Sequence, residues 1–327
     1  MSAGTHTSKS LRAAAIAVAC TALFAALFIG LVTYLDARWS PNQEDDVNIS
    51  GSLTADPYYV LLIGSDSRKN TALYTGKSNE HAQVDQHADI MTLVRVDPNT
   101  YTITLLTVPR DTVLDPKGKK INNSLINNDP TEVVDEVEKL TGVRANYYIM
   151  TTFVAFQDFI DALGGVTIDV PINFSGSDPK TGATVDVPAG EAKHLDGAET
   201  LVVVRARGEY TYKQDANRQA TVRDVERALF EKVLAYRGVL GVERVLEALG
   251  DDVQTNLNLS TTGAAIMDFI RHRDQVEIYD GTGPYLGGER KSDGAWVIQA
   301  DFDQWSELVA LVDAGGDPSF TAADVRK

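Results

Sequence analysis

The sequence predicts one transmembrane helix followed by a single α/β or α+β domain in which helices cover a mixed sheet. Two patterns carry this prediction: apolar β-type runs alternate with amphipathic helical segments after residue 57, and a 23-residue stretch near the N-terminus has no charged side chain. The 327 residues are 43% hydrophobic, 8% aromatic and 23% charged. This composition is typical of a folded globular chain and excludes a disordered one.

The N-terminal segment predicts where the chain is located. Residues 13–35 are long enough to cross a hydrocarbon core, which needs about 20 apolar residues. Lys9 and Arg12 precede the segment, so the positive-inside rule places residues 1–12 in the cytoplasm and the remainder of the chain outside. The alternatives are a cleaved signal peptide, for which the segment is too long, and a lipid-modified Cys20, which has too little apolar sequence before it.

Charge and cysteine content exclude several classes of function. The chain has 30 Lys and Arg against 46 Asp and Glu, a net charge of −16, and the part beyond residue 38 carries a net −18. Binding to nucleic acid through a general basic surface is therefore not expected. The one cysteine cannot form an internal disulfide, and no Cys/His cluster has the spacing of a zinc site.

The first predicted strands follow a polar tether at residues 36–56. Residues 58–63 form a continuous apolar run with β-type residues, the pattern of a strand buried on both faces. Residues 90–96 and 101–108 read as two strands around Asp97-Pro98-Asn99-Thr100, which is typical of a hairpin with a four-residue turn.

Helices are predicted where apolar residues recur at helical spacing. Asp129 as N-cap and Pro130 at the first helical position open one helix, which Gly142 ends. A second helix is expected over 152–163 and a third over 219–236. The remaining predicted elements are strands at 166–170, 200–206 and 276–279 and helices near 242–249, 261–272 and 301–313.

Acidic and arginine side chains follow the ends of several predicted strands. Arg205 and Arg207 are two residues apart, and side chains at i and i+2 of a strand share a face about 6.5–7 Å apart. Two guanidinium groups on one face are suited to two adjacent phosphates. The alternative is an edge strand whose two arginines are simply solvated.

Three further residues indicate a phosphate-binding site. Arg218 lies near a predicted helix N-terminus, which suits an anion, and Asp66 with Asp89 can hold Mg²⁺ together with substrate phosphate oxygens. Alternatively, the arginine is an ordinary solvent-exposed residue on a helix surface, and the aspartates stabilise turns or cap helices. Because ligands in α/β folds bind at strand ends, we interpret these residues as one site. No P-loop, dinucleotide fingerprint or nucleophile elbow occurs.

Seven segments of the chain form an ordered set of motifs. They are VLLIGSDSR (60–68), ADIMTLVRVDPNT (88–100), ITLLTVPRDT (103–112), KINNSL (120–125), DALGGVTIDVP (161–171), HLDGAETLVVVRAR (194–207) and DANRQ (215–219). Together with the N-terminal anchor, this set resembles the LytR-CpsA-Psr (LCP) family of cell-wall proteins over about residues 57–240, with a matching tail to about 316.

The resemblance implies a fold and a function. It implies an α/β/α sandwich over residues 57–316 with a short tail at 317–327, and a buried site for a polyprenyl pyrophosphate. The expected reaction is a phosphotransferase-type ligation of a glycopolymer, such as teichoic acid or capsule, from an undecaprenyl-pyrophosphate carrier to peptidoglycan. This reaction takes place at the outer face of the cell membrane, and no nucleic-acid partner is expected.

The resemblance also assigns roles to single residues. Asp66 and Asp89 match the acids associated with Mg²⁺, and with Arg110 they are the expected catalytic residues. The expected pyrophosphate-binding residues are Arg68, Arg110, Arg205, Arg207 and Arg218. Asp111 is expected to orient Arg110.

One helix departs from the family pattern. Thr221 and Val222 stand where many members have an arginine and a glutamine, and Arg223 or Arg227 is the expected substitute. The insert between Arg68 and Asp89 is interpreted as a mobile loop at the rim of the site.

Two other functions remain open at this point. The first is a phosphatase of the same fold that uses water as acceptor in place of peptidoglycan. The second is a protein without catalysis, either a lipid-binding scaffold or a membrane-anchored regulator of transcription, although a net charge of −18 outside the membrane opposes binding to DNA.

Overall fold

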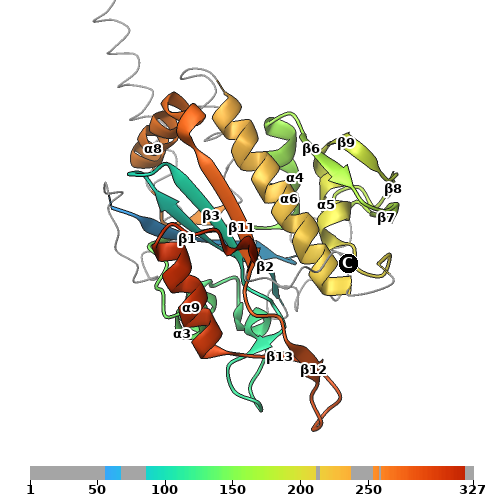
Figure 1. The fold of residues 1–327 in the computed structure, drawn as a ribbon. Coiled ribbons are helices and arrows are strands. Elements are labelled where there is room, and N and C mark those ends of the chain that lie inside the picture. Colours follow the sequence, from blue (N-terminus) through green and yellow to red (C-terminus); the bar gives the residue numbers. More distant parts are fainter. Residues whose placement is uncertain (1–55, 68–85, 211–213, 237–252, 258, 321–327) are drawn as a thin grey trace, which may run out of the picture.

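The computed structural model describes residues 56–67, 86–210, 214–236, 253–257 and 259–320 (Figure 1). The predicted transmembrane segment 13–35, the tether, the insert that begins at Arg68 and the predicted helix at 242–249 lie outside these ranges. Within them, no helix has the length and apolar composition that crossing a bilayer requires.

A six-stranded mixed sheet forms the centre of the fold. In spatial order its strands are β10 (Gln254–Thr255), β5 (Tyr147–Thr151), β1 (Tyr58–Ser65), β2 (Ala88–Asp97), β3 (Thr102–Thr107) and β11 (Glu277–Thr282). β1, β2 and β3 pair antiparallel, whereas β5 runs parallel to β1 and β11 runs parallel to β3. The predicted hairpin and the mixed character of the sheet are confirmed.

Helices cover both faces of this sheet, which makes a three-layer α/β/α arrangement (Figure 1). α3 (Thr131–Thr141) and α9 (Phe302–Asp313) pack on one face, where Trp305 is buried in the same core cluster as Leu61 and Leu93. On the other face lie α4 (Phe153–Ala162), α5 (Gly197–Arg205), α6 (Gln214–Ala235) and α8 (Leu259–Arg271).

The helix ends follow most of the capping signals of the sequence, but α3 starts at Thr131, so its N-cap is Pro130 and not Asp129 as predicted. The Asp129 carboxylate accepts a hydrogen bond from the Thr131 backbone N–H at 2.9 Å, and Gly142 ends α3 with a φ of 74°. The Thr152 hydroxyl accepts from the Ala155 backbone N–H at the start of α4. The helices predicted at 261–272 and 301–313 are confirmed as α8 and α9, and the strands at 166–170 and 276–279 as β6 (Val166–Val170) and β11.

The prediction of a strand at 200–206 is wrong, because residues 200–205 lie in helix α5. Asp196 and Glu199 form a capping box that starts this helix, with each side chain accepting a hydrogen bond from the other residue's backbone N–H. The valine run that suggested a strand is buried between α4 and α6, so tertiary packing outweighs its β-propensity.

Short strands complete the fold in three smaller sheets. β6 pairs with β9 (Gly190–Leu195), β7 (Phe174–Ser177) pairs with β8 (Thr184–Val187), and β13 (Trp296–Gln299) lies between β12 (Gly287–Glu289) and β4 (Thr112–Val113). β4 begins two residues after Arg110 in the chain. The third sheet therefore holds the segment that leaves β3 and carries this arginine.

Candidate functional site

An apolar cavity of about 870 Å³ lies between the central sheet and the helices α4, α5, α6 and α8. Its walls are made of aliphatic and aromatic side chains, which include Val60, Leu62, Val94, Phe153, Phe156, Phe159, Val202, Leu229, Phe230 and Phe269. Along α6 the lining residues run from Arg218 to Leu234, a distance of about 24 Å at 1.5 Å per residue. The cavity is thus long, has mostly apolar walls and is suited to a hydrocarbon chain.

One end of the cavity is polar and charged. β1 ends there, β2 begins there, and the loop after α5 meets the first turn of α6 at the same place. Four of the predicted site residues line this end, namely Asp66, Asp89, Arg207 and Arg218. We call this end the polar mouth.

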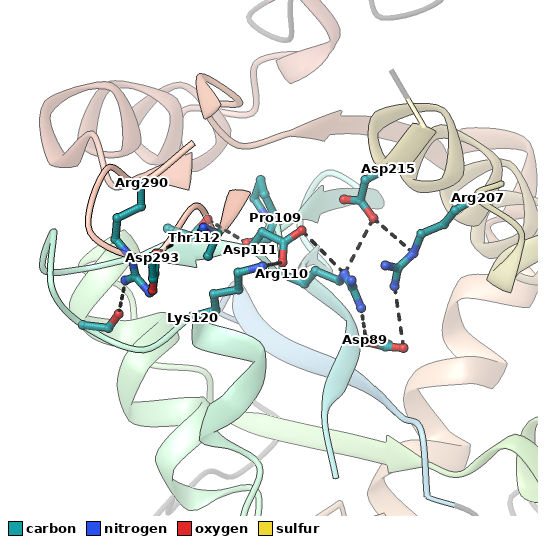
Figure 2. A network of polar contacts seen from close by, with 12 residues as sticks. Asp89, Pro109, Arg110, Asp111, Thr112, Lys120, Arg207, Asp215, Arg290 and Asp293 are labelled. Carbon is teal, nitrogen blue, oxygen red and sulfur yellow. Dashed lines mark hydrogen bonds and ion pairs between the residues drawn. The ribbon is translucent and has the colours of Figure 1, made fainter. Parts of the chain in front are cut away.

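Arginines and aspartates form a continuous network at the polar mouth (Figure 2). Arg110 is ion-paired with Asp89, and its Nε lies 3.6 Å from Oδ1 of Asp215. Arg207 bridges the same two acids, with Nη2 3.9 Å from Asp89 Oδ2 and Nε 3.7 Å from Asp215 Oδ1. Two carboxylates therefore hold two guanidinium groups side by side.

A third arginine joins the network through Asp215. The Nε and Nη2 atoms of Arg218 both lie 3.0 Å from Asp215 Oδ1, and Gln219 donates to Oδ2 at 2.8 Å. Burial by itself would raise the pKa of Asp215, but Arg218, Gln219 and Arg110 outweigh it and lower this pKa. Asp215 is consequently ionised and holds three arginines in place.

Positive charge exceeds negative charge among these five residues, since three guanidinium groups face two carboxylates. Burial lowers the pKa of Arg207, and the positive charges of Arg110 and Arg218 lower it further. An anion at the polar mouth would relieve this repulsion and would meet several N–H donors at once.

Asp66 and Asp89 are the residues available to a metal ion. Asp66 accepts from the His87 backbone N–H at 2.7 Å, and its Oδ2 lies 3.3 Å from His87 Nδ1. Burial raises the pKa of Asp66, the His87 hydrogen bond opposes this, and the charge of Asp89 raises it again. Two carboxylates close enough to repel each other fit Mg²⁺, which takes one or two carboxylates plus phosphate oxygens. No larger cluster of three His, Cys, Asp or Glu side chains placed for a metal occurs within the described ranges.

The sequence model of the LytR_cpsA_psr family matches residues 33–311. The chain belongs to this family.

Similar proteins include two teichoic acid transferases of Bacillus subtilis. The chain is 27% identical over 242 residues to the polyisoprenyl-teichoic acid–peptidoglycan teichoic acid transferase TagV, a match that covers 71% of this chain and 58% of TagV. It is 26% identical over 275 residues to TagU, covering 82% of this chain and 80% of TagU. The chain thus spans less than two thirds of the length of TagV.

The crystal structure of TagV from Bacillus subtilis has the same fold. It superposes on this chain with a TM-score of 0.63 at 21% identity, and the match covers 81% of this chain and all of TagV's resolved chain. At this level of identity the likeness shows the fold alone. The α/β/α arrangement with a mixed sheet is therefore the fold of LytR_cpsA_psr proteins of known structure.

The structure places Arg205 differently from the sequence-based expectation. Because residues 197–205 are helical, Arg205 and Arg207 do not share a strand face, and the predicted i, i+2 pair of forks is wrong. Arg205 lines the cavity with its guanidinium 4.3 Å from the ring centroid of Phe153 and remains exposed. Arg207 lies in the network with Asp89 and Asp215. Arg68 lies outside the described residues.

Asp111 lies beside Arg110, as the family resemblance implied. Its Oδ2 is 3.9 Å from Arg110 Nε, and its Oδ1 accepts from Lys120 Nζ at 2.8 Å (Figure 2). Lys120 comes from the KINNSL motif and was not among the expected site residues. It holds Asp111 from the side opposite Arg110.

The two arginines expected to replace the missing family residues have other partners. Arg227 is ion-paired with Asp280 on β11 and donates to the Ile278 carbonyl at 2.7 Å. Arg223 directs its Nε to Asp280 at 3.4 Å. Val222 instead lines the cavity, so the helix turn after Arg218 contributes hydrocarbon to this LytR_cpsA_psr site.

Besides Lys120, three residues of the network were not predicted from the sequence. Asp215 and Gln219 lie within the DANRQ motif, of which only Arg218 was predicted to be a site residue. Tyr285, whose hydroxyl lies 3.4 Å from Asp215 Oδ2, belongs to no motif. Only the tertiary structure brings it to the polar mouth.

Proposed function

We propose that this chain transfers a glycopolymer from a polyprenyl-pyrophosphate carrier to peptidoglycan. The observation that supports the proposal is a cavity with hydrocarbon walls that has three arginines close together at one end. A prenyl pyrophosphate matches this site, because its apolar tail suits the cavity and its doubly phosphorylated head suits the arginines. The names of the relatives TagV and TagU, both teichoic acid–peptidoglycan transferases, support the same reaction class.

Arg110, Arg207 and Arg218 bind the pyrophosphate in this proposal. Their guanidinium groups are already oriented by Asp89 and Asp215, so little conformational entropy is lost when the head group binds. An acceptor hydroxyl of peptidoglycan attacks the phosphorus that carries the glycan. The bridging P–O bond breaks, prenyl phosphate leaves, and the hydroxyl proton is released.

Neutralisation of the phosphates is the main contribution of the protein to this step. Negative charge accumulates on the phosphoryl oxygens and the leaving prenyl phosphate, and preformed cationic donors stabilise such charge. Asp66 and Asp89 would hold Mg²⁺ beside the same phosphates. The ion would act as a Lewis acid on the phosphoryl oxygens.

We further propose that residues 13–35 anchor the domain at the outer face of the membrane, where lipid carriers present their head groups. The 23 uncharged residues and the basic residues before them support this placement. The partners would then be the lipid-linked polymer, peptidoglycan and the membrane itself.

A single experiment separates the candidate functions. The purified domain is supplied with a lipid-linked glycan and Mg²⁺, in parallel with and without peptidoglycan, and polymer is quantified in the soluble and the wall-bound fractions. Polymer covalently attached to peptidoglycan is the expected result. Equal release of free polymer in both tubes would instead identify a phosphatase, and unchanged donor in both would indicate a scaffold without catalysis.

A further inference from the structure

A carboxyl group interrupts the hydrocarbon wall of the cavity. Glu226 lies on α6 two turns beyond Arg218, about 12 Å along the helix from the polar mouth. It lines the cavity in the same stretch of the helix as Val222, Val225 and Leu229, and only 9% of its surface is exposed. Neither the proposed chemistry nor the pyrophosphate network uses this residue.

Only one oxygen of Glu226 is satisfied. The Thr92 hydroxyl on β2 donates to Oε1 at 2.8 Å, while Oε2 has no hydrogen-bond partner among the described residues. Buried carboxylates normally have several partners, since an ionised oxygen without one costs several kcal/mol in an apolar environment. A protonated carboxyl avoids most of this cost.

The charged groups that face Glu226 come from its own helix and from β11. Arg223, one turn earlier on α6, favours the ionised carboxylate, but it also bonds Asp280 and the Thr107 hydroxyl. Asp280 on β11 opposes ionisation, and β2 contributes only the neutral Thr92. Burial is the largest influence and raises the pKa of Glu226 to about 7.

We propose that Glu226 is a specificity-determining residue of the lipid cavity. The Glu226 side chain must be neutral when a hydrocarbon chain fills the cavity, so the hydrocarbon chain binds together with a proton. Oε2 is itself buried and has no hydrogen-bond partner among the described residues, and a chain in the cavity replaces the water that would otherwise lie beside the Glu226 side chain. Desolvation then disfavours the carboxylate further, and the bound state keeps its proton to higher pH. This inference rests on the proposed function, because it takes the cavity to be the site of the prenyl chain.

Geranylgeranyl pyrophosphate tests the proposal, with inorganic pyrophosphate as a probe of the polar mouth alone. Affinities of both are measured at pH 5.5 and pH 8.5 by calorimetry in buffers of different ionisation enthalpy. The pKa of Glu226 in the free protein is about 7. Between pH 5.5 and pH 8.5 the affinity for the prenyl probe is therefore expected to fall by up to about 30-fold more than the affinity for inorganic pyrophosphate. Calorimetry should record uptake of close to one proton at pH 8.5 and almost none at pH 5.5.

Glu226→Gln provides the comparison. This variant should bind the prenyl probe with the same pH dependence as inorganic pyrophosphate and without the extra proton. Thr92→Val is the second variant and keeps the carboxyl but removes the donor to its ionised form, so the loss of prenyl affinity should move to higher pH.

The outcomes distinguish this inference from the proposed function. Failure of the wild-type chain to bind the prenyl probe at either pH overturns both. Tight prenyl binding without proton uptake, or a Glu226→Gln variant that keeps the wild-type pH dependence, overturns only the role of Glu226. If Glu226→Gln does not fold, an unchanged pH midpoint in Thr92→Val overturns it instead.

Discussion

The Nε atom of Arg110, just beyond the end of β3, lies 3.6 Å from Oδ1 of Asp215 in the first turn of α6. The same carboxylate contacts Arg207 at 3.7 Å and Arg218 at 3.0 Å. One largely buried acid therefore orients three guanidinium groups that come from three separate segments of the chain. The geometry of the polar mouth depends on this acid as much as on the arginines themselves.

Replacing Asp215 by Asn should disrupt catalysis more than folding. The change leaves Arg110, Arg207 and Arg218 without their shared anion. Arg218 also loses a charge-assisted hydrogen bond, which contributes about 1.5–3 kcal/mol. We expect kcat/KM for polymer transfer to fall by about 10- to 100-fold. Transfer to peptidoglycan, measured with a lipid-linked glycan, checks this.

Asp293→Asn is the matched control. Asp293 also binds an arginine, Arg290, but this pair lies apart from Asp215 (Figure 2), and neither residue lines the cavity. The control should transfer polymer at the wild-type rate. A normal kcat/KM in Asp215→Asn would contradict the role assigned to the shared carboxylate.

Arg207 and Arg205 should differ in their effect on head-group affinity. Arg207 lies between Asp89 and Asp215, whereas Arg205 lies over the Phe153 ring. Arg207→Ala should weaken binding of inorganic pyrophosphate by about 1.5–3 kcal/mol, and Arg205→Ala by less than about 1 kcal/mol. Isothermal titration of each variant measures both values. Equal losses would show that Arg205 reaches the head group as well.

Asp66 should make Mg²⁺ dependence sensitive to mild acid. Its pKa is raised above 3.8, mainly by burial and also by the charge of Asp89. Protons therefore compete with the metal at a higher pH than for an ordinary aspartate, and the Mg²⁺ concentration for half-maximal activity should rise as pH falls through this pKa. Titrations of Mg²⁺ across pH 4–7 check this.

Asp66→Asn serves as the comparison for that pH series. It should need about tenfold or more Mg²⁺ at every pH and should lose the pH dependence that belongs to Asp66. A wild-type Mg²⁺ requirement in Asp66→Asn would exclude this residue as a ligand.

Filling the cavity should separate tail binding from head-group binding. Leu229 lines the cavity on α6 and is half-buried, so Leu229→Trp places an indole in the path of a prenyl chain. Affinity for geranylgeranyl pyrophosphate should fall at least tenfold while affinity for inorganic pyrophosphate stays within twofold. A thermal melt confirms that the variant is folded. Parallel losses for both probes would mean that the chain does not lie along α6.

Glu226 should make the folded domain less stable at alkaline pH. Its pKa is about 7 in the folded chain against 4.5 unfolded, so the folded state holds the proton more tightly and stability falls as pH rises between these values. Above pH 7 the buried carboxylate costs up to about 3 kcal/mol. Glu226→Gln should raise Tm at pH 8 and leave it almost unchanged at pH 4.

Glu231→Gln on the same helix is the control for this melt. Glu231 is exposed, so its replacement should shift Tm little at either pH. A gain for Glu226→Gln that is the same at pH 4 and pH 8 would attribute the effect to packing and not to charge.

Local patterns determined most of the elements. The apolar run at residues 58–63, the hairpin turn before Tyr101 and the hydrogen bonds that Asp129 and Thr152 accept at helix starts each depend on neighbours within a few residues. The sequence motifs likewise indicated which acids and arginines matter, since Asp66, Asp89, Arg207 and Arg218 all line one cavity. Such features are encoded locally and can be inferred without coordinates.

The tertiary structure alone decided how these residues meet. The valines before Arg205 have β-propensity, yet a capping box and burial between α4 and α6 make them helical, and this separates Arg205 from Arg207. Tyr285 and the contacts of Glu226 likewise depend on packing between distant segments. Propensity and spacing describe a chain one segment at a time, whereas the polar mouth and the cavity arise from the way those segments pack against one another.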